Sequence, residues 1–357
     1  MQDCMIISGT RPEIIKLAPV FLALKAQLSV TWVHSGQHTS IADSAFTEFN
    51  IQPDVVLTRP ESSSLGGLLA GLIASLTGVI ESHQPRAVLV HGDTSSTLAG
   101  CLAAFHAQVP VIGHVEAGLR SADLANPFPE EANRKLVAQL ASRHYAPLPA
   151  ARENLLREGI AQDRILVTGN TVIDAQRILL SGAGGNGHRD QVLVTCHRRE
   201  NWVHMASICA AVERLANAKP GLVFKFVMHP NPALQQQIKG LLGGLRNVRL
   251  LQPLAYRALQ LALRDSCCVL TDSGGIQEEA PSYGVKAVVV RRHTERMESV
   301  HAGMSALVDP DDSNAIYLQV LQYIEEGPQQ PSQLYGDGMA ADRITDDITT
   351  TLSECSL

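Results

Sequence analysis

Two carboxylates stand directly after predicted strands, where an acid or a base could act on a ligand. Asp93 lies in His91-Gly-Asp-Thr-Ser-Ser-Thr97, after an apolar run at 87–90. Glu116 lies in His114-Val-Glu-Ala-Gly-Leu-Arg120, after an apolar run at 109–113. Ligands of open α/β sheets bind beyond the carboxyl ends of the strands. Asp93 is therefore either an acid or base or the cap of the next helix, whereas the position of Glu116 favours a functional role.

A third carboxylate, Glu130, opens the segment Glu130-Glu-Ala-Asn-Arg134. Pro129 suits the first turn of a helix, and both Glu130 and Glu131 suit the helix dipole. Helix capping alone would explain these residues, so the local pattern leaves the role of Glu130 open.

Two glycine-containing turns are candidate anion sites. In Ser8-Gly-Thr-Arg-Pro-Glu-Ile-Ile-Lys16, a predicted strand ends, and Thr10 and Glu13 have capping-box spacing. Arg11 and Lys16 lie near the N-terminus of the helix that follows, where anions are favoured. This segment indicates either a phosphate or diphosphate site or an ordinary capped helix with surface cations.

The second turn lies in Thr271-Asp-Ser-Gly-Gly-Ile-Gln-Glu-Glu-Ala280. Ser273, Gly274 and Gly275 lead from a strand into a helix, where backbone N–H groups can approach phosphate oxygens. Glu279, about two turns further along, could reach ribose hydroxyls. The pattern is neither G-x-G-x-x-G nor a Walker A loop.

His197 is the histidine best placed for chemistry. It lies in Val194-Thr-Cys-His-Arg-Arg-Glu200, directly after a predicted strand and beside two arginines. Histidine suits proton transfer near neutral pH, and neighbouring cations keep it neutral and attract anions. A lone histidine is usually not catalytic, but this position favours a site.

Composition excludes several classes of protein. The chain has 357 residues, of which 45% are hydrophobic and 18% charged, with a net charge of −6. It is therefore neither disordered nor a basic protein that coats nucleic acid. The start lacks a basic n-region, and the longest apolar stretch, 65–80, is shorter than the ~20 residues of a membrane span. The seven cysteines include no C-x-x-C, which indicates reduced thiols and a cytoplasmic protein.

Other catalytic classes lack their motifs. The chain contains no H-E-x-x-H and no Cys/His cluster, so we expect no metal site. It also contains no G-x-S-x-G elbow of a serine hydrolase.

Alternating β-rich runs and helical patterns predict an α/β fold with parallel sheets. A single sheet of ten strands is one solution, but two Rossmann-like, doubly wound domains suit this length better. We expect an N-terminal domain at 1–168 and a C-terminal domain at 169–340. A glycine-rich stretch at 181–187 marks the linker region or a loop just after it.

Ten motifs, in order along nearly the whole chain, resemble those of non-hydrolysing UDP-N-acetylglucosamine 2-epimerases of the bacterial type. They are Gly9–Lys16, Gly36–His38, His91–Thr94, His114–Arg120, Pro129–Arg134, Thr168–Asp174, His197–Glu200, Asp272–Pro281, Thr294–Arg296 and Tyr335–Gly338.

This resemblance implies a glycosyltransferase-B-like architecture of two domains facing a cleft, with a C-terminal helix at about 341–357 packing back on the first. It further implies a homodimer that interconverts UDP-GlcNAc and UDP-ManNAc without a cofactor, by elimination of UDP to 2-acetamidoglucal and re-addition. The product would supply ManNAc for surface polysaccharide.

The resemblance also assigns roles to residues. The catalytic residues would be Asp93, Glu116, Glu130 and His197. The substrate-binding residues would be Arg11, Lys16, Arg134, His229, Ser273, Gly274, Gly275, Glu279 and Arg296. Gln37 and His38 match part of an allosteric UDP-GlcNAc site.

Three positions depart from the family pattern. Thr39 replaces the usual Arg or Lys, which puts allosteric activation in doubt; Cys196 and Met297 replace a small residue and a proline. Three other readings stay open: a hydrolysing 2-epimerase that releases ManNAc and UDP, a retaining glycosyltransferase, and a non-catalytic nucleotide-sugar sensor. The carboxylates and His197 argue against the last two.

Overall fold

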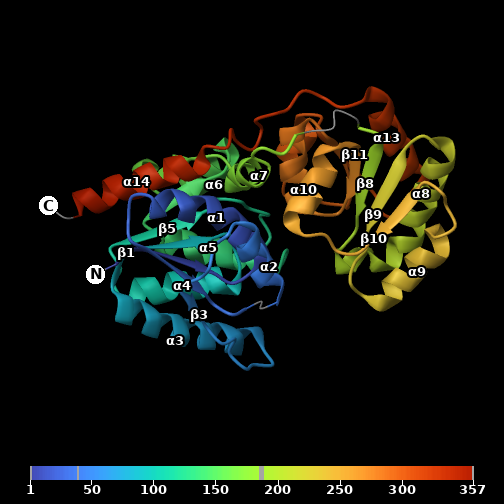
Figure 1. Cartoon of the computed structure of the whole chain (residues 1–357). Helices are drawn as coiled ribbons and strands as arrows, with labels where there is room; N and C mark the ends of the chain where they lie inside the picture. The colour runs from blue at the N-terminus through green and yellow to red at the C-terminus, as the bar shows by residue number, and fades with distance from the viewer. Residues whose placement is uncertain (1, 38–39, 185–188, 356–357) are drawn as a thin grey trace. The chain divides into compact units, whose positions relative to one another are not determined.

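The computed structural model describes residues 2–37, 40–184 and 189–355 and divides into two compact units. The first consists of Met1–Leu179 and Gly336–Leu357, and the second of Leu180–Tyr335. Each unit contains one parallel sheet covered by helices on both faces, so the predicted α/β fold with two Rossmann-like domains is confirmed (Figure 1).

The first unit has a seven-stranded sheet in the order β3-β2-β1-β4-β5-β6-β7. The strands are β1 (Gln2–Ser8), β2 (Val30–His34), β3 (Val55–Val56), β4 (Pro85–His91), β5 (Val111–Val115), β6 (Arg143–Ala146) and β7 (Ile165–Val167). Every pair is parallel. The strand order reverses between β1 and β4, which makes their carboxyl ends the topological switch point where ligands bind in such sheets.

Helices cover both faces of this sheet. They are α1 (Arg11–Lys25), α2 (Ser40–Glu48), α3 (Leu65–His83), α4 (Ser95–His106), α5 (Glu130–Leu140), α6 (Pro149–Arg157), α7 (Thr171–Leu179) and α14 (Ala340–Glu354). Apolar side chains of α3, α4 and α5 form one core with those of β1, β4 and β5. On the other face, α1 packs against α7 and α14 (Figure 1). The helix α7 follows the boundary expected at residue 168 and belongs to the first unit.

The second unit has a six-stranded sheet in the order β10-β9-β8-β11-β12-β13. Its strands are β8 (Gln191–Thr195), β9 (Val223–Val227), β10 (Val248–Leu251), β11 (Ser266–Thr271), β12 (Lys286–Val290) and β13 (Ser305–Val308). Here the order reverses between β8 and β11, whose last residues, Thr195 and Thr271, lie in register and share a hydroxyl hydrogen bond of 2.7 Å.

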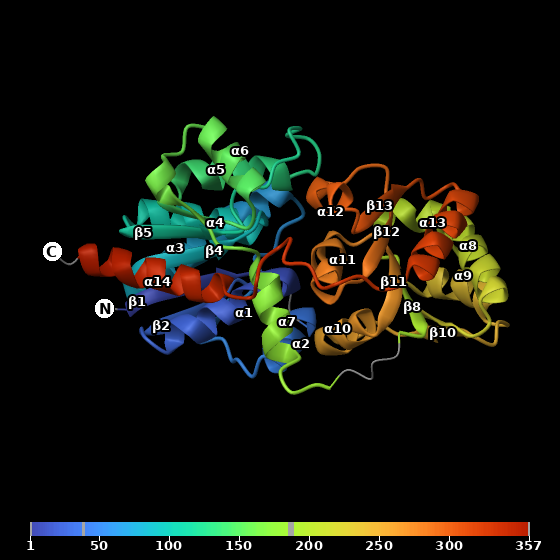
Figure 2. The ribbon, with the colours of Figure 1, turned by 90° about the horizontal axis from the view of Figure 1, so that it is seen from above.

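Two layers of helices enclose the second sheet. The helices α8 (Met205–Ala218), α9 (Pro232–Leu242) and α13 (Ser313–Glu326) cover one face, and α10 (Tyr256–Arg264) and α11 (Gly274–Glu279) cover the other (Figure 2). The short helix α12 (Met297–His301) precedes β13. Short 3-10 turns lie at Gln162–Arg164, Arg199–His204 and Ala280–Tyr283.

The helix α3 is 19 residues long and mostly apolar. By length and composition alone it could cross a membrane, and among the described residues it is the one helix for which this holds. The helix continues for three polar residues beyond the apolar stretch at 65–80 and ends at His83. Its row Leu68, Leu72, Leu76 and Ile80 is buried, at the i, i+4 spacing of one helix face.

Candidate active site

Glu13 joins two loops at the switch point of the first unit. Its side chain is 2% exposed and accepts hydrogen bonds from the backbone N–H groups of Gly9 (2.9 Å) and Thr10 (2.6 Å). It also accepts from the hydroxyls of Thr94 (2.7 Å) and Thr97 (2.9 Å). The predicted capping box is therefore present, and the same carboxylate fixes the loop after β1 to the loop after β4.

The two cations of this segment differ in their surroundings. Arg11 is half-buried at the first residue of α1. Lys16 is 7% exposed, and its ammonium group forms a salt bridge with Glu116. Lys16 is therefore not one of the surface cations of an ordinary capped helix.

Glu116 is held in an unusual backbone conformation directly after β5. Its φ is 64°, in the left-handed region that costs a non-glycine residue of order 1–3 kcal/mol. Its carboxylate accepts from Lys16 and from Asn170 Nδ2 at 2.9 Å, and His91 Nε2 lies 3.8 Å away. Burial lowers the pKa of His91, against the opposing charge of Glu116, so this histidine stays neutral beside the carboxylate.

Asp93 is paired with a buried arginine. Arg134 Nε and Nη2 approach Asp93 Oδ2 at 2.8 and 2.6 Å, and Asn133 Nδ2 donates to the Asp93 carbonyl at 2.8 Å. Burial lowers the pKa of Arg134, but Asp93 and Glu131 outweigh burial and raise it overall. The first two turns of α5 thus bring Arg134 to the end of β4, and Glu130 lies half-buried at the first residue of the same helix.

In the second unit, Asp272 organises the loop that carries His197. Asp272 is fully buried and accepts from the backbone N–H groups of His197 (2.9 and 3.0 Å) and Arg198 (2.9 Å), and from Asn201 Nδ2 at 3.0 Å. The thiol of Cys196 also donates to it at 3.2 Å. The ring of His197 lies 6.0 Å from the ring of His229, so these two predicted residues are neighbours.

The glycine turn of the second unit is packed against Arg296. Ser273 caps α11, with its Oγ accepting from Ile276 N at 3.4 Å. A Cβ on Gly274 would lie 2.7 Å from Arg296 Cζ, so a side chain at this position would displace the guanidinium group. Arg296 also pairs with Glu278 (2.8 Å) and Glu295 (2.9 Å). Gly275 follows with more space around it, its nearest contact at 3.7 Å.

Glu279 and Glu295 are two carboxylates of this unit with defined partners. Glu279 is 5% exposed and accepts from Tyr256 Oη at 3.0 Å and Gln260 Nε2 at 2.7 Å. Although burial raises the pKa of Glu295, Arg296 and Arg291 outweigh it and lower that pKa to about 2.

The remaining predicted residues are placed only in part. Gln37 is half-buried after β2, and its Oε1 accepts from Ser96 Oγ at 2.6 Å. His38 and Thr39 lie outside the described residues. Within the described ranges, no three or more His, Cys, Asp or Glu side chains are arranged to hold a metal ion.

Sequence reasoning missed the supporting residues of both clusters. Glu131 and Asp272 are buried carboxylates that hold predicted residues in place, and Asn170 is a partner of Glu116. Asp272 carried a usable signal, because it stands between a strand and the predicted glycine turn.

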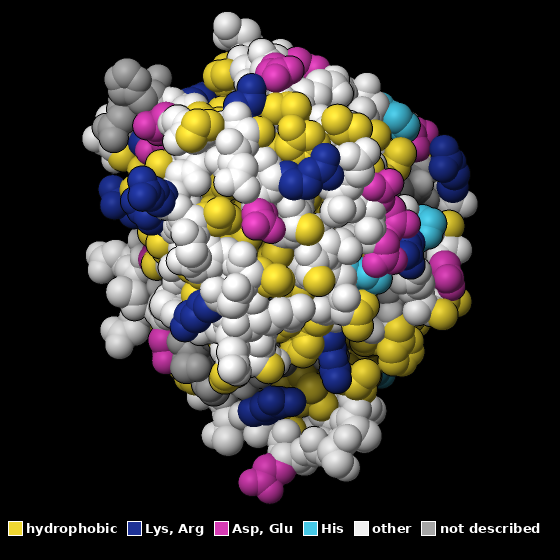
Figure 3. Space-filling model, turned by 90° about the vertical axis from the view of Figure 1, so that its right-hand side faces the viewer, with side chains coloured by type: hydrophobic (Ala, Val, Ile, Leu, Met, Phe, Trp, Pro, Cys, Tyr) yellow, Lys and Arg dark blue, Asp and Glu magenta, His cyan; other side chains and the backbone are white. Residues whose placement is uncertain are grey.

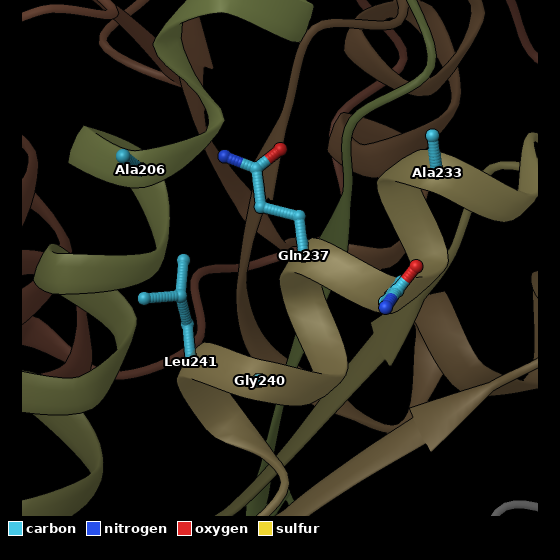
Figure 4. Close-up of a pocket in the computed structure, with 6 residues that line it drawn as sticks. Ala206, Ala233, Gln237, Gly240 and Leu241 are labelled. Atoms are coloured by element: carbon cyan, nitrogen blue, oxygen red, sulfur yellow. The ribbon is translucent and has the colours of Figure 1, made fainter.

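A surface hollow of about 490 Å³ lies between α8 and α9, and none of the residues that line it belongs to these clusters. Gln237 extends from α9 into it, with Leu241 beside and Ala206 opposite on α8 (Figure 4). The lining contains no charged or nucleophilic side chain, so we assign it no catalytic role. On the side of the molecule bearing α8, α9 and α13, Lys and Arg appear as separate groups among apolar and polar side chains (Figure 3).

The fold and the charged clusters at both switch points define a two-domain α/β enzyme with a glycosyltransferase-B-like fold. The UDP-N-acetylglucosamine 2-epimerase family model matches residues 22–349. The UDP-N-acetylglucosamine 2-epimerase of Salmonella typhimurium is 38% identical, over 95% of this chain and 96% of the relative. The chain belongs to the UDP-N-acetylglucosamine 2-epimerase family, as its motifs predicted.

Two solved structures are similar over almost the whole chain. The S. aureus MnaA–UDP co-structure has a TM-score of 0.89 and 39% identity, covering 99% of this chain and 97% of that chain. The UDP-GlcNAc 2-epimerase of Neisseria meningitidis bound to UDP-GlcNAc has a TM-score of 0.87 and 36% identity, covering 98% and 100%.

Proposed function

We propose that this protein interconverts UDP-GlcNAc and UDP-ManNAc by inverting C2, without net hydrolysis. Its membership of the epimerase family and the UDP and UDP-GlcNAc ligands named for two similar structures support this substrate. The observation that carries the proposal is the pair of carboxylates at neighbouring strand ends, Glu116 and Asp93, each fixed by a buried cation.

The chemistry requires elimination, because the proton on C2 is not α to a carbonyl and is not acidic. A base removes this proton, and its bonding electrons form the C1–C2 double bond. The C1–O bond breaks, and its electrons leave with UDP, which gives 2-acetamidoglucal. UDP then adds back to C1, and a proton reaches C2 from the opposite face.

We assign the proton transfers to Asp93, Glu116 and Glu130. Reprotonation on the opposite face needs a second group, and carboxylates held at different strand ends can serve the two faces. In this scheme Lys16 and Arg134 keep Glu116 and Asp93 in fixed orientations.

The second unit is assigned to UDP. The N–H groups of Gly274 and Gly275, the Ser273 hydroxyl and Arg296 would stabilise the leaving diphosphate. His197 and His229 lie beside each other after β8 and β9, and we assign them to the diphosphate and the sugar. Glu279 would accept from ribose hydroxyls. No cofactor takes part in these steps.

NMR of the purified protein with UDP-GlcNAc in D2O tests this function. We expect a stable mixture of UDP-GlcNAc and UDP-ManNAc with deuterium at C2. Free ManNAc and UDP would instead establish the hydrolysing reaction. UDP binding without any turnover would establish the sensor. If the proposed function is right, alanine at Asp93, Glu116 or Glu130 should abolish turnover and preserve UDP binding, and alanine at His197 should abolish turnover.

We also propose a cytoplasmic homodimer that supplies ManNAc for surface polysaccharide. Support for the second copy comes from α3, where one helix face is buried and Ala70 and Ala74 on the opposite side are exposed; Phe105 of the adjoining α4 is 51% exposed. Light scattering should give a dimer, and Ala74→Arg on the exposed side of α3 should give a monomer. A monomeric wild-type protein would refute the dimer.

A further inference from the structure

Glu131 is a buried carboxylate that the assigned chemistry does not use. Its side chain is fully buried at the start of α5, beside the candidate acid or base Glu130. Its Oε2 accepts from Arg134 Nη1 at 3.1 Å and from the backbone N–H of Ser121 at 3.0 Å. Its Oε1 is buried and has no hydrogen-bond partner among the described residues. Burying a carboxylate costs more than the helix dipole returns, so capping alone does not explain this residue.

The partner of Glu131 is the arginine that holds Asp93. Arg134 is 6% exposed and uses different nitrogen atoms for the two carboxylates: Nη1 for Glu131, and Nε and Nη2 for Asp93. A guanidinium group is planar, so fixing one side of it fixes the direction of the other N–H groups. The orientation of the Asp93 carboxylate therefore depends on the Glu131 carboxylate.

Glu131 also fixes the loop between Glu116 and Glu130. Ser121 lies in this loop, and its N–H group is bound to the same oxygen that accepts from Arg134. One buried atom is thus tied to the helix that carries Glu130, to the loop that follows Glu116 and, through Arg134, to Asp93.

We propose that Glu131 is a positioning residue for the epimerisation, which sets the orientation of Asp93 through Arg134. This role rests on the proposed function. It predicts a loss in the chemical step rather than in substrate binding, because UDP is assigned to residues of the second unit. A misplacement of about 1 Å at a reacting group can cost about 10²-fold in rate.

The test compares Glu131→Gln with a matched control, Asp347→Asn. Asp347 of α14 is also a part-buried carboxylate paired with an arginine, Arg143, and it accepts from Tyr145 Oη at 2.8 Å. Arg143 begins β6, so this pair lies at the opposite end of the sheet from Asp93. Both variants lose one charge from an ion pair of the first unit, and only Glu131→Gln acts on Asp93.

We expect Glu131→Gln to lower kcat by about 10²-fold, with KM for UDP-GlcNAc and the affinity for UDP within roughly twofold of wild type. Asp347→Asn should keep wild-type kcat even where it lowers Tm. In an Arg134→Lys background, Glu131→Gln should have little further effect, because both act through one guanidinium group.

Three results would overturn the proposal. Equal kcat in Glu131→Gln, Asp347→Asn and wild type would mean that Glu131 serves only the fold. Additive losses in the double variant would mean that Glu131 does not act through Arg134. A wild-type protein that leaves UDP-GlcNAc unchanged would refute the proposed function itself, and with it this role.

Discussion

The four hydrogen bonds to Glu13 allow its contribution to the free energy of unfolding to be worked out from the structure. In Glu13→Gln, the amide oxygen can still accept from the N–H groups of Gly9 and Thr10. The amide nitrogen then faces the hydroxyls of Thr94 and Thr97, which donate to the carboxylate in the wild type. Two hydrogen bonds to a charged group are lost, and such bonds contribute roughly 1.5–3 kcal/mol each.

The hydroxyl groups can turn and accept from the new amide, and Thr97 can donate to the His91 carbonyl, which lies 2.6 Å away. With this partial recovery, we expect the free energy of unfolding of the first unit to fall by about 2–4 kcal/mol. A domain of 150–250 residues loses about 2–4 °C in Tm per kcal/mol, so Tm should fall by about 4–16 °C.

Calorimetry of the wild type, Glu13→Gln and a surface control measures this effect. Glu81→Gln is the control, because Glu81 is exposed on α3 and surface changes usually stay within about 0.5 kcal/mol. The variant should also lose turnover, since Glu13 holds the loop that carries Asp93. A Tm of Glu13→Gln within about 1 °C of the control would refute the hydrogen-bond reasoning.

Three further predictions concern other buried groups. Asp272→Asn should lower the free energy of unfolding of the second unit by about 3 kcal/mol, because the new amide NH2 would point at N–H groups that donate to the carboxylate in the wild type. A denaturant midpoint equal to that of the wild type would contradict this. Gly274→Ala should lower Tm, since its Cβ would lie 2.7 Å from Arg296 Cζ, whereas Gly240→Ala meets open space in a helix and should raise it. Burial lowers the pKa of His114 from 6.5 to about 3, so the unfolded chain binds the proton first as the pH falls. Stability should be full above pH 6.5 and decline between about pH 6.5 and 3, and His114→Gln should reduce that decline in urea titrations across this range.

The fold could be predicted largely because continuous apolar runs marked most of the strands. The strands that end at Ser8, His91 and Thr271 could be predicted from the residues of each run alone. By contrast, β6 has the sequence Arg143-His-Tyr-Ala146, which contains polar residues and forms no apolar run. The strand β3 has only two residues. Both depend on pairing with a neighbouring strand, which the local pattern does not contain.

The candidate site was predictable in its residues but not in its connections. The spacing of Thr10 and Glu13 predicted a capping box, but the bonds from Thr94 and Thr97 join positions more than 80 residues apart. Lys16 was expected at a phosphate, and its salt bridge with Glu116 depends on how α1 packs over the sheet. Long-range ion pairs of this kind follow from the tertiary fold.

The discontinuity of the first unit constrains the order in which the protein folds during synthesis. The chain leaves this unit after Leu179 and returns at Gly336, so the second unit is inserted between them. Ile344 and Ile348 of α14 are fully buried, and α14 packs against α1. On the ribosome, α1 is translated before the second unit and α14 after it. The first unit therefore exposes an unfilled apolar groove while the whole second unit is translated, and this nascent chain is where chaperones would act.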